Sequence, residues 1–381
     1  MKISSDHILT THVGSLPRSA AVADLLIRKD REEPYDAGEF ARVIRDGVAE
    51  IVARQVEVGI DVVSDGETSK VGYSTYVKDR LTGFGGDHTP KPNLDLAPYP
   101  EFRKRMVAFM GAQSFRRTCC IGPVALKDLE AVRTDIDNFK AALAAKPSVE
   151  GFLNAASPGV VASFQPNQYY PTHEAYIEAV TAALQPEYEA IAAAGLVLQV
   201  DCPDLAMSRH TGFQDLSEAE FLARAELHVE ALNQALVNVP REQVRIHICW
   251  GNYEGPHDHD IPLETVMPVI RKLKAGAFAF EHANPRHEHE WTMWRDAKLP
   301  DDTILIPGVL DSSTNYVEHP ELVAQRIERF AGFVGRERVI AGTDCGFGTF
   351  VRYSKVDPEI TFKKLQAMSE GAAIATRRLW G

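Results

Sequence analysis

The chain has 381 residues, of which 45% are hydrophobic, and a formal net charge of −12 at pH 7. This length and hydrophobic content suffice for one large buried core. The negative charge argues against a nucleic-acid partner, because phosphates are neutralised by clusters of Lys and Arg and the sequence contains no such cluster.

Targeting and membrane signals do not stand out in the sequence. It contains no run of about 18 apolar residues and no basic segment followed by an apolar one. Its five cysteines are an odd number and are scattered along the chain, which suits a reducing compartment better than a disulfide framework. We therefore expect a cytoplasmic protein with no membrane partner.

One pattern repeats along the chain: a short apolar run ends in polar or glycine residues, and an amphipathic stretch follows. Strands are predicted to end at His12–Ser15, Ser64–Glu67, Ile121–Val124, Gln199–Asp201, His247–Cys249, Phe280–Glu281, Gly308–Asp311 and Thr343–Cys345. Helices are predicted over residues 37–58, 172–194, 217–237, 263–273, 319–333 and 358–378. Eight strands alternating with helices predict an α/β fold, a single-domain (β/α)8 TIM barrel over residues 1–381.

Two further segments have weaker signals. A ninth apolar run, Val160–Phe164, is expected to be a loop or an edge segment, because residues 165–171 after it have turn chemistry. The His- and Asp-rich stretch His257–Asp260 lies between Gly and Pro residues and is expected to be a solvated loop, with a lid over the active site as the alternative.

The carboxyl ends of the strands build the active site in TIM barrels, and four side chains there favour a metal. His247 and Cys249 are two apart in a strand, so both can point at one atom beyond its end. Glu281 and Cys345 end two later strands. One imidazole, one carboxylate and two thiolates are typical ligands of Zn²⁺, so the sequence predicts a zinc site.

Such a ligand set favours sulfur chemistry. Zinc removes the proton of a bound thiol, and the thiolate is the form that attacks carbon. A site that already holds two thiolates is better suited to presenting sulfur than to activating water. The sequence therefore predicts alkylation of a small-molecule thiol.

These motifs resemble the catalytic half of the cobalamin-independent methionine synthase family, whose zinc enzymes alkylate thiols. The resemblance rests on His247-Ile248-Cys249, Glu281 and Asp344-Cys345-Gly346 for the zinc ligands, and on Val13–Pro17, Asp65–Glu67 and Gln199–Asp201 for other strand ends. It spans residues 7–375 and implies methyl transfer to homocysteine, giving methionine, on a single barrel.

An amino-acid acceptor needs groups for both of its charges. Glu67 and Asp201 are the candidates for its ammonium, and Ser15 for its carboxylate. The alternative for Glu67 and Asp201 is a salt bridge at the barrel mouth with Arg209 or Lys70.

Two further residues are candidates for catalysis. Asp311 and Ser313 follow the seventh predicted strand, with a helix cap as the alternative for Asp311.

The chain departs from the family at positions that bear on the methyl donor. Folate-using members have a Trp where this chain has Ala125–Leu129, and a His two residues after the Asp, where this chain has Ser313. Donors therefore rank as a corrinoid protein first, then a simple methylated compound, then a folate.

Two other enzyme readings stay open. One resembles epoxyalkane:coenzyme M transferase, which opens an epoxide with a zinc thiolate and would need a sulfonate pocket, for which Arg18 and Lys70 are the candidates. The other is a metal-free barrel related to uroporphyrinogen decarboxylase.

Overall fold

The computed structural model describes residues 1–110, 116–146, 149–353 and 355–381, and its centre is a parallel eight-stranded barrel. The strands are β1 (Leu9–Thr10), β2 (Val62–Ser64), β5 (Glu150–Ala156), β6 (Val197–Asp201), β7 (Val244–Ile248), β8 (Ala277–Phe280), β9 (Ile304–Leu310) and β10 (Ile340–Thr343). They pair in the order β1-β10-β9-β8-β7-β6-β5-β2, and a parallel bridge from Thr11 to Val62 closes the circle. The predicted TIM barrel is confirmed.

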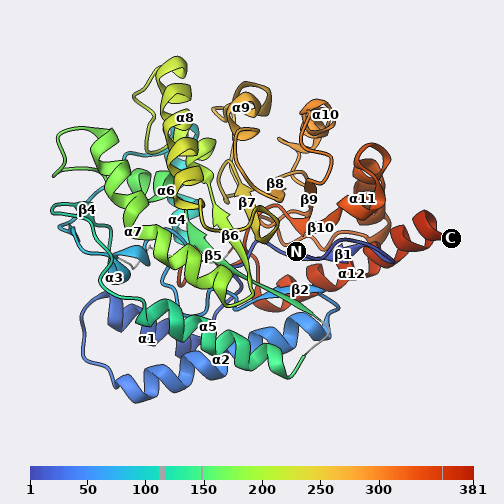
Figure 1. Cartoon of the computed structure of the whole chain (residues 1–381), viewed down its shortest axis with the longest axis horizontal. Coiled ribbons are helices and arrows are strands. Elements are labelled where there is room, and N and C mark those ends of the chain that lie inside the picture. The colour runs from blue at the N-terminus through green and yellow to red at the C-terminus, as the bar shows by residue number, and fades with distance from the viewer. Residues whose placement is uncertain (111–115, 147–148, 354) are drawn as a thin grey trace.

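Helices surround the strands (Figure 1). They are α1 (Ala20–Asp30), α2 (Ala37–Glu57), α3 (Val77–Arg80), α4 (Pro100–Met110), α5 (Glu130–Ala144), α6 (Pro158–Phe164), α7 (His173–Ala193), α8 (Glu218–Ala235), α9 (Leu263–Ile270), α10 (Trp291–Asp296), α11 (Pro320–Val334) and α12 (Pro358–Trp380). The six predicted helices correspond to α2, α7, α8, α9, α11 and α12. Several begin at a side chain that accepts a backbone N–H, such as Ser217, whose capping box starts α8.

The third barrel strand differs from the prediction. Residues 121–124 form no strand; Cys119–Cys120 before them (β4) pairs antiparallel with Phe84–Gly85 (β3) in a separate two-stranded sheet. The barrel strand is β5, whose sequence includes Gly, Asn and two Ala residues. These residues have low strand propensity, so the sequence does not predict a strand here.

The ninth apolar run is also different from the expectation. Val160–Phe164 belongs to α6, not to a loop or an edge strand. Ser157 accepts a hydrogen bond from the backbone N–H of Val160 at 3.0 Å, and Pro158 occupies the first turn. An N-cap serine followed by proline is a helix start, and this signal outweighs the β-branched residues after it.

The barrel interior is partly polar directly below the strand ends. Arg245 on β7 is fully buried, lies over the ring of Phe152, and donates to Gln199 at 2.7 Å. Leu9 and residues from β8, β9 and β10 form a small apolar cluster in the core. The interior is thus a packed support for the residues at the barrel mouth.

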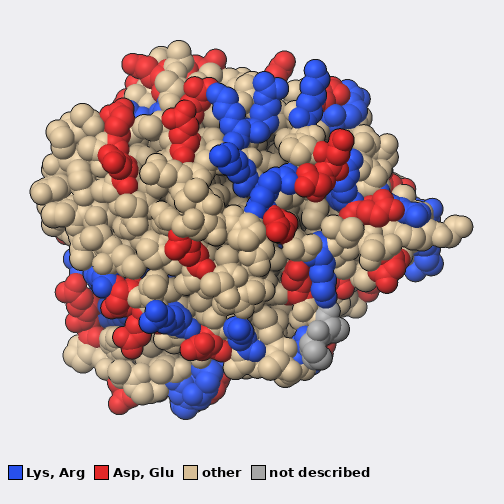
Figure 2. All heavy atoms as spheres, viewed as in Figure 1, with Lys and Arg blue, Asp and Glu red and all other residues tan. Residues whose placement is uncertain are grey.

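The molecular surface carries both signs of charge. On the face drawn in Figure 2, Lys and Arg alternate with Asp and Glu. Among the described residues, no helix has the length and apolar character needed to cross a membrane.

Candidate metal centre

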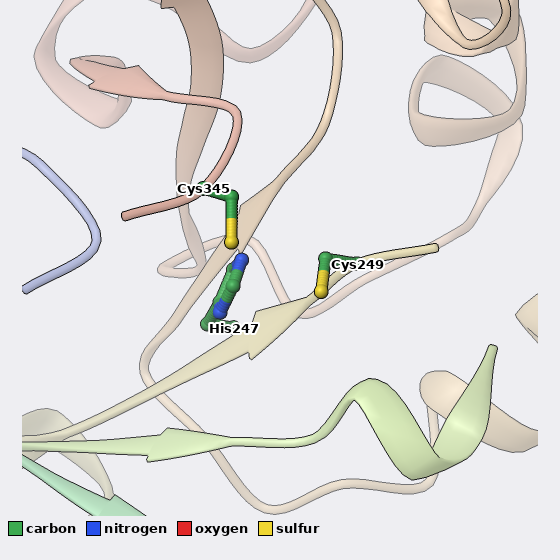
Figure 3. A group of neighbouring side chains, drawn as sticks. All are labelled: His247, Cys249 and Cys345. Atoms are coloured by element: carbon green, nitrogen blue, oxygen red, sulfur yellow. The ribbon is translucent and has the colours of Figure 1, made fainter. Parts of the chain in front are cut away.

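Three of the four predicted metal ligands meet at one point at the barrel mouth. His247 is on β7, Cys249 follows that strand by one residue, and Cys345 comes two residues after β10. One ligand atom of each lies within 4.8 Å of the others, and all three residues are buried. Figure 3 shows the two sulfurs and the imidazole facing one another. Two thiolates and an imidazole at this spacing suit zinc, which binds such ligands at about 2.0–2.3 Å.

The electrostatics of the three residues, called the sulfur cluster below, favour a thiolate. A hydrogen bond from Cys249 lowers the pKa of Cys345 to about 5, against burial, and His247 adds to the effect. The same contact raises the pKa of Cys249. The shared hydrogen bond therefore favours the thiolate form of Cys345, which is the form that binds a metal.

Asp201 orients the imidazole of the sulfur cluster. Its Oδ1 lies 3.1 Å from Nδ1 of His247 and accepts a second hydrogen bond from Gln199 at 2.8 Å, while its Oδ2 accepts one from Asn154 at 3.0 Å. Burial opposes a charge on His247, but the bonds to Asp201 and Cys345 raise its pKa to about 10. A carboxylate on the far nitrogen fixes the ring so that the other nitrogen can bind a metal.

Glu281, the fourth predicted ligand, lies beside the cluster with both oxygens engaged. Oε1 accepts from the backbone N–H of Trp250 at 2.7 Å, and Oε2 accepts from Asn284, also at 2.7 Å. Burial raises its pKa. Each carboxylate oxygen has a second lone pair, so these hydrogen bonds hold Glu281 in place and leave it able to bind a metal.

Asp344 holds the loop that carries Glu281. Its carboxylate accepts the backbone N–H groups of His282 and Ala283 at 2.7 Å and of Asn284 at 2.8 Å. The residue is buried directly before Cys345. The loop after β8 is thus tied to the loop after β10, which brings Glu281 and Cys345 to the same side of the barrel.

A cavity of about 420 Å³ opens above the sulfur cluster, and the three predicted substrate-binding residues line it: Ser15, Glu67 and Asp201. Oε2 of Glu67 is buried and has no hydrogen-bond partner among the described residues. Burial and Asp201 raise the pKa of Glu67 to about 8, against the effect of Lys70. An incoming ammonium group would satisfy this carboxyl.

The backbone at Glu67 is strained in a way that supports a functional role. Its φ is +54°, a left-handed conformation that is uncommon for residues other than Gly. Arg18 clamps it by donating to the carbonyl oxygen of Glu67 at 2.8 Å.

Asp311 and Ser313, the predicted catalytic pair, bond to each other. Oδ1 of Asp311 accepts from both the backbone N–H and the hydroxyl of Ser313 at 2.7 Å, and Oδ2 accepts from Thr314 at 3.2 Å. Neither residue is among those that line the cavity. This geometry is a local turn of the loop after β9.

Arg18 and Lys70, the candidates for binding the sulfonate of coenzyme M, do not line the cavity either. Arg18 donates to the carbonyl oxygens of Glu67 and Gly348, and Lys70 donates to that of Asn154. Both side chains are held by backbone carbonyl groups at the barrel mouth.

The loop after β7 is not simply solvated, which corrects the expectation for residues 257–260. His257 and His287 both contact Oδ2 of Asp260, at 2.9 and 3.0 Å, and the buried His210 lies 3.2 Å from Oδ1. Asp95 is 3.7 Å from the other nitrogen of His210. These five residues are called the histidine–aspartate network below; Asp258 and His259 next to it are exposed.

Comparison with known proteins places these observations in a family. The family model described as the catalytic domain of cobalamin-independent synthase matches residues 8–89 and 105–373. The methionine synthase of Saccharolobus islandicus (strain L.S.2.15 / Lassen #1) is 24% identical over 382 residues, covering 97% of this chain and 95% of that protein. The methionine synthase of Sulfolobus acidocaldarius is 23% identical, with 97% and 93% covered.

Solved structures agree on the fold. A B12-independent methionine synthase from Shewanella sp. W3-18-1, in complex with selenomethionine, gives a TM-score of 0.74 at 20% identity and covers 98% of this chain and 99% of its own. A putative vitamin-B12 independent methionine synthase from Listeria monocytogenes gives 0.66 at 19% identity, with the same coverage. Because the family model matches most of its length, the chain belongs to the cobalamin-independent methionine synthase catalytic-domain family and is a transferase.

Proposed function

We propose that the protein transfers a methyl group to homocysteine and so forms methionine, with Zn²⁺ bound by His247, Cys249 and Cys345. Glu281 is the proposed fourth ligand. The observation that carries the proposal is the position of the sulfur cluster in a cavity that also contains Glu67. The similarity to proteins named methionine synthases supports the acceptor. When bound, zinc keeps the acceptor's sulfur in the thiolate form.

The residues of the chain have distinct tasks in this proposal. Glu67 binds the acceptor's ammonium group, because its Oε2 is buried without a partner among the described residues. Ser15 faces the same cavity and offers a hydroxyl to the carboxylate. Its hydroxyl would be 2.0 Å from a Cβ at position 346, so Gly346 leaves it room. Asp201 positions His247 and closes the cavity wall behind the ammonium site.

The loop after β7 forms one side of the acceptor site. Asn252 donates to the carbonyl oxygen of Gly346 at 2.6 Å and accepts from Ser312 at 3.1 Å. It therefore links three strand-end loops around the sulfur cluster. A side chain in this position shields the thiolates from water, which strengthens the electrostatic contacts inside the cavity.

The test is an assay of thiol loss and methionine formation with zinc-loaded protein, homocysteine and a panel of methyl donors. Coenzyme M replaces homocysteine in a parallel set with epoxides. Methionine formation with homocysteine, and no reaction of coenzyme M, is the expected result. Thiol loss only with coenzyme M would contradict the proposal, although Arg18 and Lys70 are engaged by backbone groups and do not favour that reading.

A further inference from the structure

The cavity extends beyond the space that the acceptor would occupy. Its volume of about 420 Å³ lies within the range of small-molecule pockets, and a small amino acid bound between Glu67 and the sulfur cluster leaves part of it empty. The methyl donor must reach the sulfur through this remaining part. The residues that line it should therefore match the donor in shape and charge.

Four aromatic side chains form one side of the remaining space. Tyr73 follows β2, Phe164 ends α6, and Phe350 and Tyr353 follow β10; together they are called the aromatic wall. The ring centre of Tyr73 lies 5.6 Å from that of Phe164 and 5.4 Å from that of Phe350, and Phe350 lies 6.3 Å from Tyr353.

The shape of the aromatic wall suits a rounded group better than a flat one. The ring planes of the contacting pairs are inclined by 39° to 77°. A flat heterocycle stacks best between parallel ring faces, whereas rings inclined to one another leave no flat slot and present their π faces at several angles. Such surfaces bind quaternary ammonium groups and similar cations.

The charges around the wall differ between its two ends. At the inner end Tyr73 lines the cavity together with the residues of the sulfur cluster, and burial, Cys249 and Cys345 raise its pKa. Glu67 and Asp201 line the same end. The half-buried Arg117 lines the cavity as well, together with the ion-paired Lys91 and Asp215. Burial lowers the pKa of Arg117, while the nearby phenols of Tyr353 and Tyr73 act in the opposite direction. A positive group is therefore favoured beside Glu67 and Asp201, and a negative group beside Arg117.

We infer that the methyl donor is a compact zwitterion in which a quaternary ammonium or sulfonium centre lies on the aromatic wall and a carboxylate faces Arg117. The inference rests on the proposed methyl transfer to homocysteine. It concerns only the donor, which the family match leaves open.

The chemistry of the transfer agrees with this donor. The methyl carbon forms a bond to the thiolate sulfur while its bond to the onium nitrogen or sulfur breaks, and that electron pair stays on the leaving atom. The product leaves as a neutral amine or thioether, so no proton is needed. An amine donor would need one. Ser313 stands where folate-using members have a His, and neither Ser313 nor Asp311 lines the cavity.

Charge neutralisation adds to the rate. A cationic donor and an anionic sulfur lose their charges as the new bond forms. In a cavity with little water the charged reactants lose hydration that the less charged transition state needs less, so the barrier falls.

The first experiment measures binding directly. Calorimetric titration of the metal-free and the zinc-loaded protein uses trimethylglycine, tetramethylammonium, which lacks the carboxylate, and 3,3-dimethylbutanoate, which keeps the carboxylate but has a neutral carbon in place of the ammonium nitrogen. We expect trimethylglycine to bind most tightly and 3,3-dimethylbutanoate at least about tenfold more weakly. Equal affinity for trimethylglycine and 3,3-dimethylbutanoate would overturn the inference.

Variants locate the site. Phe350→Leu and Tyr353→Leu should each raise the KM for trimethylglycine about tenfold, with the KM for homocysteine and the zinc content unchanged. Arg117→Met should remove the preference for trimethylglycine over tetramethylammonium. Tyr316→Leu is the matched control, because that ring is 83% exposed and outside the cavity. Phe350 is part of the core, so the more exposed Tyr353 keeps the test valid if Phe350→Leu unfolds.

A donor panel separates this inference from the proposed function. Trimethylglycine and a sulfonium carboxylate are compared with methylcobalamin and a methylated folate, with homocysteine as the acceptor. Methionine formed only from the onium donors supports both the donor inference and the proposed function. Methionine formed from methylcobalamin or the folate but not from the onium donors overturns the donor inference alone, and no methionine from any donor overturns the proposed function.

Discussion

The sulfur cluster and the histidine–aspartate network are two buried groups of potential metal ligands on the same side of the barrel. Trp250, next to Cys249, stacks on His287 of the network at 4.3 Å. The cluster collects a nitrogen and two sulfurs from strand ends. The network collects imidazoles and carboxylates from loops, and two of its three imidazoles, His257 and His287, hydrogen-bond to Asp260.

The difference shows what separates a metal site from a structural ion-pair network. In the sulfur cluster the donor atoms face a common point, and the outer nitrogen of His247 is held by Asp201. In the network, both nitrogens of His287 are taken, by Asp260 at 3.0 Å and Glu290 at 2.8 Å. Groups that satisfy one another gain little from a cation, so we expect a stabilising role for His257, Asp260 and His287. His210 is the exception, because neither of its ring nitrogens has a hydrogen-bond partner among the described residues, and its ligand atom lies within 4.8 Å of those of Asp95 and Asp260. We expect the zinc in the sulfur cluster, because thiolates are the softer ligands.

The largest effect is expected for Cys345→Ser. Loss of one thiolate removes both a soft ligand and the low-pKa partner of Cys249, so zinc content should fall below about half an equivalent and methyl transfer should be lost. Metal analysis of untagged, reconstituted protein measures the zinc content, and methionine formation measures methyl transfer. Cys119→Ser, a buried cysteine outside the cluster, is the control and should keep its zinc. Full zinc retention in Cys345→Ser would show that the sulfur cluster is not the zinc site.

Glu67→Gln tests the acceptor side of the same cavity. Removing a buried carboxylate that pairs with a ligand's charge should raise the KM for homocysteine about a hundredfold, with zinc content unchanged. Initial rates at varied homocysteine give the KM. Glu57→Gln, on the exposed end of α2, is the control. An unchanged KM would show that the ammonium binds elsewhere.

Some of this geometry could be predicted from the sequence, and some could not. His247, Cys249 and Cys345 end clear apolar strands, so their convergence followed from barrel topology alone. The role of Asp201 depends on its register opposite His247 in the neighbouring strand, which no local pattern encodes.

The parts that were missed have physical reasons as well. Asn154 was not found because its strand, β5, is poor in β-branched residues. The network was not found because its members are brought together by loops, between positions 95 and 287.

Asp201→Asn is expected to have an intermediate effect. The amide cannot balance a charge on the imidazole and holds His247 less firmly, so zinc affinity should fall about 10- to 100-fold. Competition with a chromophoric chelator measures the affinity. Asp258→Asn, in the exposed part of the loop after β7, should leave it unchanged. A zinc affinity equal to that of the wild type would show that Asp201 serves only the acceptor site and does not hold His247 for the metal.

The smallest effect concerns the network and appears in the pH dependence of stability. Burial opposes the charge on His287, but Asp260 and Glu290 raise its pKa to about 10, above the value near 6.5 of an unfolded histidine. Its stabilisation is therefore complete below about pH 6.5 and is lost as the pH rises through 10. Urea denaturation of wild type and His287→Gln at pH 6, 8 and 10 should show a stability difference that shrinks with pH, with zinc content equal throughout. The exposed His289→Gln should show no such trend, and parallel curves for His287→Gln would mean that this imidazole is neutral in the folded protein.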